Sequence, residues 1–260
     1  YLQADSPVVN LQALMQIVGI MQVQNEDMYL ERAARNVLDF CDQLFIADHG
    51  SSDRTWEIAE QLSRSSPKVH ARKIANPRES SRMIAEYANT ETWVLGVDGD
   101  EIYDPRGLGL FKQRLLDGEF DDWWSIFGNV CNCTEFDPTE KRARGFMAPP
   151  CRSMTKLYNF RLILELDPQE PQRLHGRNHR FALGYHAEPR LDLQAQTPWE
   201  QAQLRCLHMC FLPRSRRDTS GAARVNVTEK LNYRERFRRV FARLIAKDQD
   251  SRYKKSKYRR

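Results

Sequence analysis

Near its middle the sequence reads Trp93-Val94-Leu95-Gly96-Val97-Asp98-Gly99-Asp100-Glu101, an apolar run that ends in a cluster of acidic residues. A short apolar run of this kind is typical of a buried strand. In open α/β sheets, ligands bind outside the carboxyl ends of the strands. Taken alone, the acidic residues could equally form a turn without a function, but their position directly after a strand favours a site.

Apolar runs and stretches with helical spacing alternate upstream of this segment. We expect strands at residues 16–21, 44–47, 69–74 and 93–97 and helices at residues 30–41, 55–62 and 78–88. Asn25-Glu26-Asp27 has the signals of a helix start, and Ser52 or Asp53 can cap the next helix or brace its loop. Strands separated by helices predict an α/β fold, with a mostly parallel sheet and helices on both faces.

Three polar clusters follow the first, second and fourth predicted strands: Gln24-Asn25-Glu26, the loop that begins at Asp48, and the acidic group after residue 97. The topology brings them to one rim of the sheet. Asp98 and Asp100 supply the hard oxygen ligands that Mg²⁺ and Mn²⁺ prefer, together with substrate phosphates. Asp48 could accept from a nucleobase N–H or simply form a turn.

The second half of the chain has a less regular pattern. We expect a helix at residues 111–116, a strand at 123–131, a basic loop at 140–150, paired strands at 154–158 and 161–166, and helices at 199–210 and 231–246. The predicted domains are an N-terminal leader (1–14), a main domain (15–212) and a basic helical C-terminal tail (213–260). The main domain divides into a half for the donor (15–105) and a half for the acceptor (106–212).

The 260 residues are 41% hydrophobic and carry a formal net charge of +5. No apolar run is long enough to span a membrane, and no secretory signal is visible, so a cytoplasmic protein is expected. The six cysteines are too sparse for a disulfide scaffold, and their spacing matches no common zinc module. Buried thiols are the favoured interpretation, with a zinc site at Cys131/Cys133 or Cys206/His208/Cys210 as the alternative.

Basic residues gather in the last part of the chain, at residues 234–260. A cationic helix and tail could hold the protein peripherally on an anionic membrane surface, but a solvated end is slightly favoured. A nucleic-acid binder usually spreads its Lys and Arg along a groove or helix face. Because the rest of the chain is mixed in sign, no nucleic-acid partner is expected.

Three segments carry a resemblance to a known family: Val18-Gly19-Ile20-Met21-Gln22-Val23-Gln24-Asn25-Glu26, Ile46-Ala47-Asp48-His49-Gly50-Ser51-Ser52-Asp53-Arg54-Thr55, and residues 94–101. In order and register they resemble the family 2 glycosyltransferases of GT-A fold. The resemblance implies a nucleotide-sugar donor such as a UDP- or GDP-sugar, an Mn²⁺ or Mg²⁺ ion, and a glycan, lipid-linked or small-molecule acceptor.

The resemblance also implies roles for single residues. Asp48 would contact the base, Asp98 the ribose or the metal, and Asp100 the metal. Asn25 and Glu26 would line the nucleotide pocket. Arg82 would face the diphosphate, although a solvated helix charge is an equal alternative.

Two histidines of the second half also resemble family positions. His208 would be a further metal ligand, and His179, in Gly176-Arg177-Asn178-His179, would be an active-site residue that acts with Asp98 and Asp100. The catalytic base is unassigned, because residues 110–220 contain no Glu-Asp pair of the kind that inverting members present. Inversion is still the implied outcome. A nucleotidyltransferase and a catalytically degenerate binding module are the alternatives.

Overall fold

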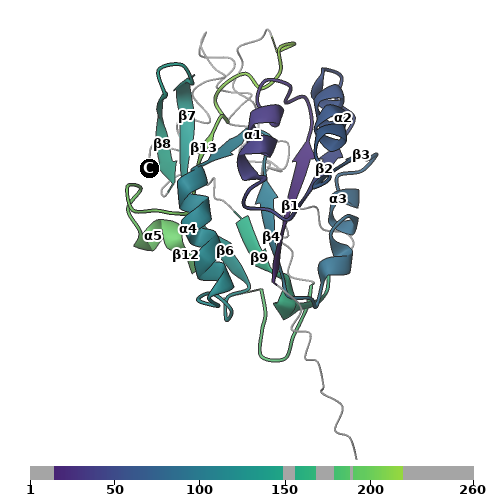
Figure 1. Cartoon of the computed structure of the whole chain (residues 1–260), viewed down its shortest axis with the longest axis vertical. Coiled ribbons are helices and arrows are strands. Elements are labelled where there is room, and N and C mark those ends of the chain that lie inside the picture. Colours follow the sequence, from purple (N-terminus) through teal and green to yellow (C-terminus); the bar gives the residue numbers. More distant parts are fainter. Residues whose placement is uncertain (1–14, 149–155, 168–178, 188–189, 219–260) are drawn as a thin grey trace, which may run out of the picture.

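The computed structural model describes residues 15–148, 156–167, 179–187 and 190–218. A seven-stranded sheet in the order β12-β6-β9-β4-β1-β2-β3 forms the centre of the molecule (Figure 1). Strands β3, β2, β1 and β4 are mutually parallel, and β9 lies antiparallel to both β4 and β6. The predicted α/β fold with a mostly parallel sheet is therefore confirmed.

The first hundred residues follow the predicted alternation closely. The elements are β1 (Gln16–Val23), α1 (Leu30–Val37), β2 (Gln43–Asp48), α2 (Thr55–Ser65), β3 (Val69–Lys73), α3 (Glu79–Arg82), the 3-10 helix η1 (Ala85–Tyr87) and β4 (Thr92–Val97). The helix expected at residues 30–41 begins at Leu30 and ends at Val37. One expectation was wrong: the single helix expected at residues 78–88 is two short ones, α3 and η1.

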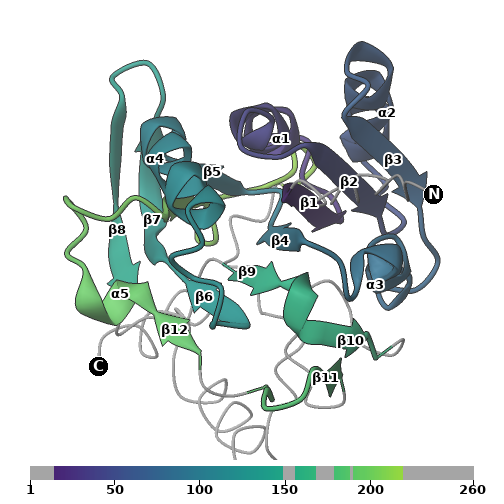
Figure 2. The same ribbon diagram turned by 60° about the horizontal axis from the view of Figure 1, so that its bottom comes forward.

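Helices cover both faces of the sheet because its central strands are apolar on both sides (Figure 2). Along β1, Ile17 and Met21 join the core under α1, α2 and α4 (Pro105–Leu116), whereas Val18 and Ile20 join a second core with η1. Successive side chains of a strand point to opposite faces, so an unbroken apolar run fits a strand that is covered twice. Burial of these faces supplies the main stabilisation of the fold.

A second sheet, in the order β5-β13-β7-β8, stands beside the first. It contains β5 (Glu101–Tyr103), β7 (Asn129–Asp137), β8 (Arg142–Ala148) and β13 (Arg205–His208). The remaining elements are β6 (Ser125–Phe127), β9 (Lys156–Asn159), η2 (Phe160–Leu162), β10 (Ile163–Glu165), β11 (Arg180–Phe181), β12 (Leu191–Asp192) and α5 (Leu193–Gln196).

The helix expected at residues 199–210 is wrong, since this stretch contains β13. Its burial alternates residue by residue from Arg205 to His208, which is the period of a strand. The basic loop expected at residues 140–150 is also wrong over most of its length, because it forms β8 at the edge of the second sheet. Arg142 and Arg144 are exposed there, and charged side chains are common on edge strands.

Two further expectations for the second half need correction. The strand expected at residues 123–131 is two strands, because the chain leaves the first sheet after Phe127 and enters the second at Asn129. The strands expected at residues 154–158 and 161–166 do not pair with each other. The Asn159 side chain accepts from the backbone N of Arg161 at 3.2 Å and starts η2, so β9 pairs with β4 and β6 and β10 pairs with β11.

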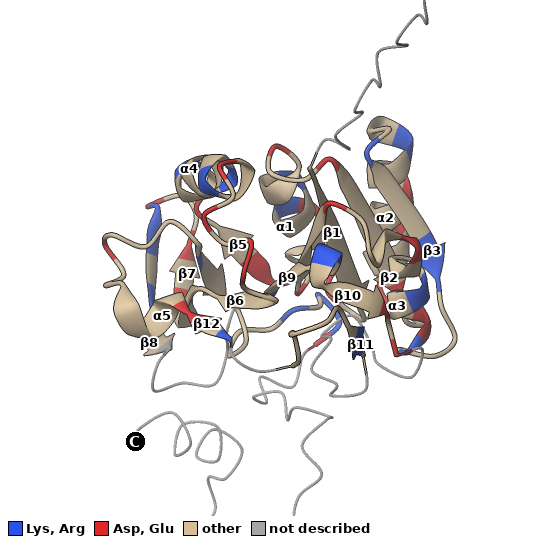
Figure 3. Ribbon diagram, turned by 90° about the horizontal axis from the view of Figure 1, so that it is seen from below, with Lys and Arg blue, Asp and Glu red and all other residues tan. Residues whose placement is uncertain are grey.

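No helix among the described residues is both long enough and apolar enough to cross a bilayer. Helices α2 and α3, beside the β3 edge of the sheet, each carry both Glu and Arg (Figure 3). The predicted leader at residues 1–14, the helix at 231–246 and the tail beyond residue 218 lie outside the described residues.

Candidate functional site

The acidic turn at residues 98–100 carries the chain from the first sheet into the second. Strand β4 ends at Val97 and β5 begins at Glu101, so Asp98 and Asp100 lie where the two sheets meet. Strand β13 pairs antiparallel with β5 and places His208 opposite Glu101. The backbone N of Met209 then donates to the carbonyl of Asp100 at 3.0 Å. The pairing of two strands thus brings a histidine 108 positions away in sequence against the acidic turn.

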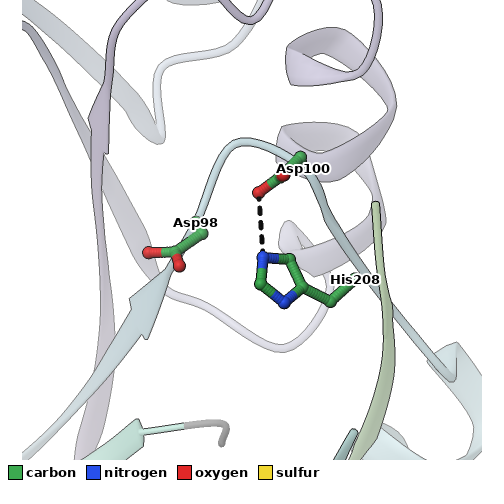
Figure 4. A group of neighbouring side chains, drawn as sticks. All are labelled: Asp98, Asp100 and His208. Atoms are coloured by element: carbon green, nitrogen blue, oxygen red, sulfur yellow. Dashed lines mark ion pairs between the residues drawn. The ribbon is translucent and has the colours of Figure 1, made fainter. Parts of the chain in front are cut away.

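Asp98, Asp100 and His208 form a group that could hold a metal ion (Figure 4). One ligand atom from each residue lies within 4.8 Å of the other two. Oδ1 of Asp100 is buried and makes no hydrogen bond within the described part of the chain; it faces Nε2 of His208 at 3.5 Å. Adjacent ligand atoms of an octahedral ion with metal–ligand bonds of about 2.1 Å are about 3.0 Å apart, so a small adjustment would let both atoms bind one cation.

Arg214 supplies a buried positive charge to the same group. Its Nη1 lies 2.6 Å from Oε1 of Glu26 and 3.2 Å from Oδ2 of Asp100. The two oxygens of Asp100 therefore face different partners, His208 on one side and Arg214 on the other. This arrangement leaves Oδ1 for a cation while Oδ2 keeps its hydrogen bond to Arg214.

The charges of the site shift the pKa values of its members in opposite directions. Burial raises the pKa of Glu26 to about 8, even though Arg214 opposes the shift. Burial would also raise the pKa of Asp100, but His208 and Arg214 outweigh it and hold that pKa below its usual range. Burial raises the pKa of Glu101 as well, with Asp98 adding to the effect. These six acidic and basic groups thus share one region, where the charge of each depends on its neighbours.

The loops after β1 and β2 are joined by hydrogen bonds. Oδ1 of Asn25 accepts from the backbone N of Ser52 at 2.8 Å, and the backbone N of Glu26 donates to Oγ1 of Thr55 at 2.7 Å. Asn25 has a φ of 54°, a left-handed conformation that Asn tolerates better than most residues. Asp53 accepts from the backbone N of Thr55 at 2.9 Å, which confirms the expected bracing role.

A cavity of about 350 Å³ opens beside these loops. Its lining comes from the loop after β1, the loop after β2 and the segment 212–218: Gln24, Asn25, Ser52, Leu212, Arg214, Ser215, Arg217 and Asp218. Hydrogen bonds from the backbone N of Met28 to the carbonyl of Arg214 (3.1 Å) and from the backbone N of Arg216 to Oδ1 of Asp27 (2.8 Å) attach the segment to the loop after β1. Nη1 of Arg217 donates to the carbonyl of Ser52 in the loop after β2. Arg214 belongs to both the cavity and the acidic group, so the two features form one site.

Some of the residues predicted for the site lie at the cavity or beside the acidic group, and others do not. Asn25 lines the cavity, and Glu26 contacts Arg214. Asp48 is buried, and its carboxylate accepts from the backbone N and Oγ of Ser51; its contact with a base stays a prediction. Arg82 is exposed on α3, and its contact with a diphosphate is likewise a prediction.

His179 lies in a different environment from His208. Its Nδ1 accepts from the backbone N of Asp167 at 2.9 Å, and its ring packs near Trp124 and Phe181. It is not part of the Asp98, Asp100 and His208 group, and its catalytic role stays a prediction.

Sequence reasoning missed three residues that contact the acidic group. Arg214 stood among the arginines of the predicted tail, and nothing in its spacing marked it. Lys156 lies on β9, next to β4, with Nζ 3.6 Å from Oδ1 of Asp98. Glu101 was visible in the acidic run, but its bonds from the backbone N of Asp98 and the hydroxyl of Tyr103 were not. The signal for Lys156 was a single Lys directly before the apolar pair Leu157 and Tyr158.

The described cysteines are free, buried thiols, as expected. Among the residues that the structure describes, the only group of three or more His, Cys, Asp or Glu side chains that could hold an ion contains no cysteine. The zinc alternative therefore has no support in this part of the chain.

Comparisons with known proteins found several similar solved structures. Similar solved structures include S. aureus TarS 1-349 in complex with UDP (TM-score 0.40, 14% identity) and the mannosyltransferase PcManGT from Pyrobaculum calidifontis in complex with GDP-Man and Mn²⁺ (0.44, 10%). Glucosyl-3-phosphoglycerate synthase from Mycobacterium tuberculosis, in complex with Mn²⁺, UDP-glucose and phosphoglyceric acid, is also similar (0.39, 16%). These matches cover 74%, 75% and 57% of the chain, respectively.

The chain spans less than two thirds of these structures: 57% of the TarS fragment, 57% of PcManGT and 58% of the synthase. A search of curated proteins gave no significant match. The family model described as glycosyl transferase family 2 matches residues 20–177, which is more than half of the sequence. The chain therefore belongs to glycosyl transferase family 2.

Proposed function

We propose that this protein is a metal-dependent glycosyltransferase that moves a sugar from a UDP- or GDP-sugar to an acceptor hydroxyl. The observation that carries the proposal is the Asp98, Asp100 and His208 group, which adjoins a cavity with arginines in its lining. Family membership supports the same activity.

The three residues of the group fit Mn²⁺ or Mg²⁺ through two carboxylates and an imidazole. When bound, such an ion would neutralise the charge that develops on the leaving diphosphate. Arg214 holds Asp100 in place through Oδ2 and adds a second positive charge next to the cavity. Lys156 lies beside Asp98 and orients that carboxylate from the other side.

The cavity fits the nucleoside part of the donor. Hydrogen bonds between Asn25 and Ser52 hold its two loops in register, and the segment 212–218 closes it. These contacts join parts of the protein to each other, so the pocket is formed before the nucleotide binds. Binding therefore loses less conformational entropy than it would if the loops had to become ordered.

Calorimetric titration with UDP and with GDP, each with and without Mn²⁺, tests the proposal. We expect binding that depends on Mn²⁺ and is lost in Asp100→Ala. The matched control is Asp117→Ala, which removes an exposed carboxylate at the end of α4. It is expected to bind the nucleotide and Mn²⁺ as the unmodified protein does. Equal binding with and without the ion, or full binding by Asp100→Ala, would contradict the proposal.

A donor screen separates the remaining alternatives. A glycosyltransferase releases UDP or GDP from a nucleotide sugar, whereas a nucleotidyltransferase releases pyrophosphate from a nucleoside triphosphate. A binding module without activity would bind the nucleotide and release neither. We also propose inversion at the anomeric carbon, which NMR of the first product formed would test.

A further inference from the structure

Asn132 lies behind His208, on the strand next to it. Strands β7 and β13 are parallel neighbours, and their register places His208 opposite Asn132. Asn132 is completely buried, and its Oδ1 lies 3.1 Å from Nδ1 of His208. A polar side chain at this depth is costly unless it is hydrogen-bonded, so its partners indicate why it is there.

The orientation of the Asn132 amide is fixed by its other neighbours. The carbonyl of Phe146, on the adjacent strand β8, lies 3.3 Å from Nδ2 of Asn132. A carbonyl oxygen only accepts, so the NH₂ group must point to it and Oδ1 must point to His208. The thiol of Cys210 also donates to Oδ1, at 3.3 Å, which is consistent with the same orientation.

This orientation decides which nitrogen carries the hydrogen when His208 is neutral, the state in which an imidazole can bind a metal. Because Oδ1 of Asn132 accepts, Nδ1 of His208 must be the donor. A neutral imidazole with hydrogen on Nδ1 has its free lone pair on Nε2. Nε2 is the atom that faces Oδ1 of Asp100, inside the candidate metal group.

We propose that Asn132 is a positioning residue that holds His208 in the Nδ1–H tautomer, with Nε2 aimed at the cation shared with Asp98 and Asp100. The inference rests on the proposed function, since it needs a metal at this group. Partners of this kind behind a histidine ligand fix its ring and tautomer, and their loss usually weakens metal affinity about 10- to 100-fold.

Three variants of the 260-residue chain test this inference. Asn132→Val removes the acceptor, and Asn132→Asp keeps an acceptor oxygen in the same place. Asn129→Val is the matched control: Asn129 is buried on the same strand, but its side chain donates to the carbonyl of Thr197. Mn²⁺ affinity is measured from the electron paramagnetic resonance signal of the free ion, in excess UDP and, in a second series, in excess GDP.

We expect Asn132→Val to bind Mn²⁺ about 10-fold or more weakly. Asn132→Asp and Asn129→Val should stay within about threefold of the unmodified protein. If Asn132→Asp keeps its Mn²⁺ affinity, the contact with His208 is the one that matters. An Asp carboxylate still accepts from Nδ1 of His208, but it cannot donate to the carbonyl of Phe146. If Asn132→Val does not fold, Asn132→Ser replaces it. The Ser side chain is too short for its hydroxyl to reach Nδ1 of His208, so the same weakening of Mn²⁺ binding is expected.

Two results would overturn the inference and leave the proposed function intact: unchanged Mn²⁺ affinity in Asn132→Val, or an equal loss in Asn132→Val and Asn129→Val. Absence of Mn²⁺ binding by the unmodified protein in both nucleotide series would overturn the proposed function and this inference together.

Discussion

Replacement of Glu26 by Gln should remove much of the dependence of stability on pH. Glu26 is 4% exposed, and its carboxyl contacts Arg214 in the region of Asp98 and Asp100. Burial raises its pKa to about 8, compared with 4.5 for an unperturbed Glu. Between these two values the folded protein holds a proton that the unfolded chain has released.

The sign and size of the effect follow from this difference. The folded state is favoured most below the unfolded pKa of 4.5, and that advantage is lost as pH rises towards the folded pKa of about 8. For one such group, the free energy of unfolding falls by about 2.5 kcal/mol between about pH 5.5 and about pH 7.5. Gln cannot titrate, so Glu26→Gln should lack this contribution.

Urea unfolding at several pH values, in EDTA so that no divalent ion is bound, measures the effect. The slope of stability against pH should be less steep in Glu26→Gln than in the unmodified protein. Glu57→Gln, which removes an exposed carboxyl on α2, is the control and should keep the original slope. If the unmodified protein and Glu26→Gln show the same slope, the assignment of a protonated, buried Glu26 is refuted.

Two other substitutions probe the same region. In Gly99→Ala the new Cβ would lie 2.1 Å from Oε2 of Glu26 and 2.8 Å from Cγ1 of Val23. We therefore expect the free energy of unfolding, measured with urea, to fall by about 1–3 kcal/mol. Mn²⁺ should also bind more weakly in a titration. A stability equal to that of the unmodified protein would show that the turn has more room than the structure indicates. Arg214→Met leaves Asp100 without its cationic partner. In the absence of metal, we expect the free energy of unfolding to fall by about 3 kcal/mol. This value is at the lower end for a broken buried ion pair, because Glu26 is still protonated and adds no second unpaired charge. Added Mn²⁺ should restore part of that stability in thermal unfolding, and no restoration would argue against an ion beside Asp100.

The fold of residues 15–105 could be predicted from the sequence because its signals are local. Each strand from β1 to β4 is an apolar run, and each is followed by polar residues that the parallel sheet must place on one rim. Asp98 and Asp100 were found in this way. The requirement for Gly at position 99 was not predicted, because it depends on Glu26 and Val23, whose side chains leave no room for a Cβ at the turn.

The fold of residues 106–212 was harder to predict because its elements depend on pairing between distant segments. Residues 205–208 alternate in burial only because β13 lies between β5 and β7. The same pairing joins His208 to Asp100 and Asn132 to His208. No local signal in Arg205-Cys206-Leu207-His208 specifies these neighbours, so a helix was the expectation for this stretch, and Asn132 was not considered.

Arg214 and Glu26 are 188 positions apart, yet they share one hydrogen bond at the site. Contacts across so long a loop gain nothing until most of the intervening chain is ordered, because the entropy of closing the loop must be overcome first. During synthesis, Asp98 and Asp100 emerge long before His208 and Arg214 can neutralise them. The cavity should therefore be among the last features to form, so that binding of any ligand there would report a completely folded domain.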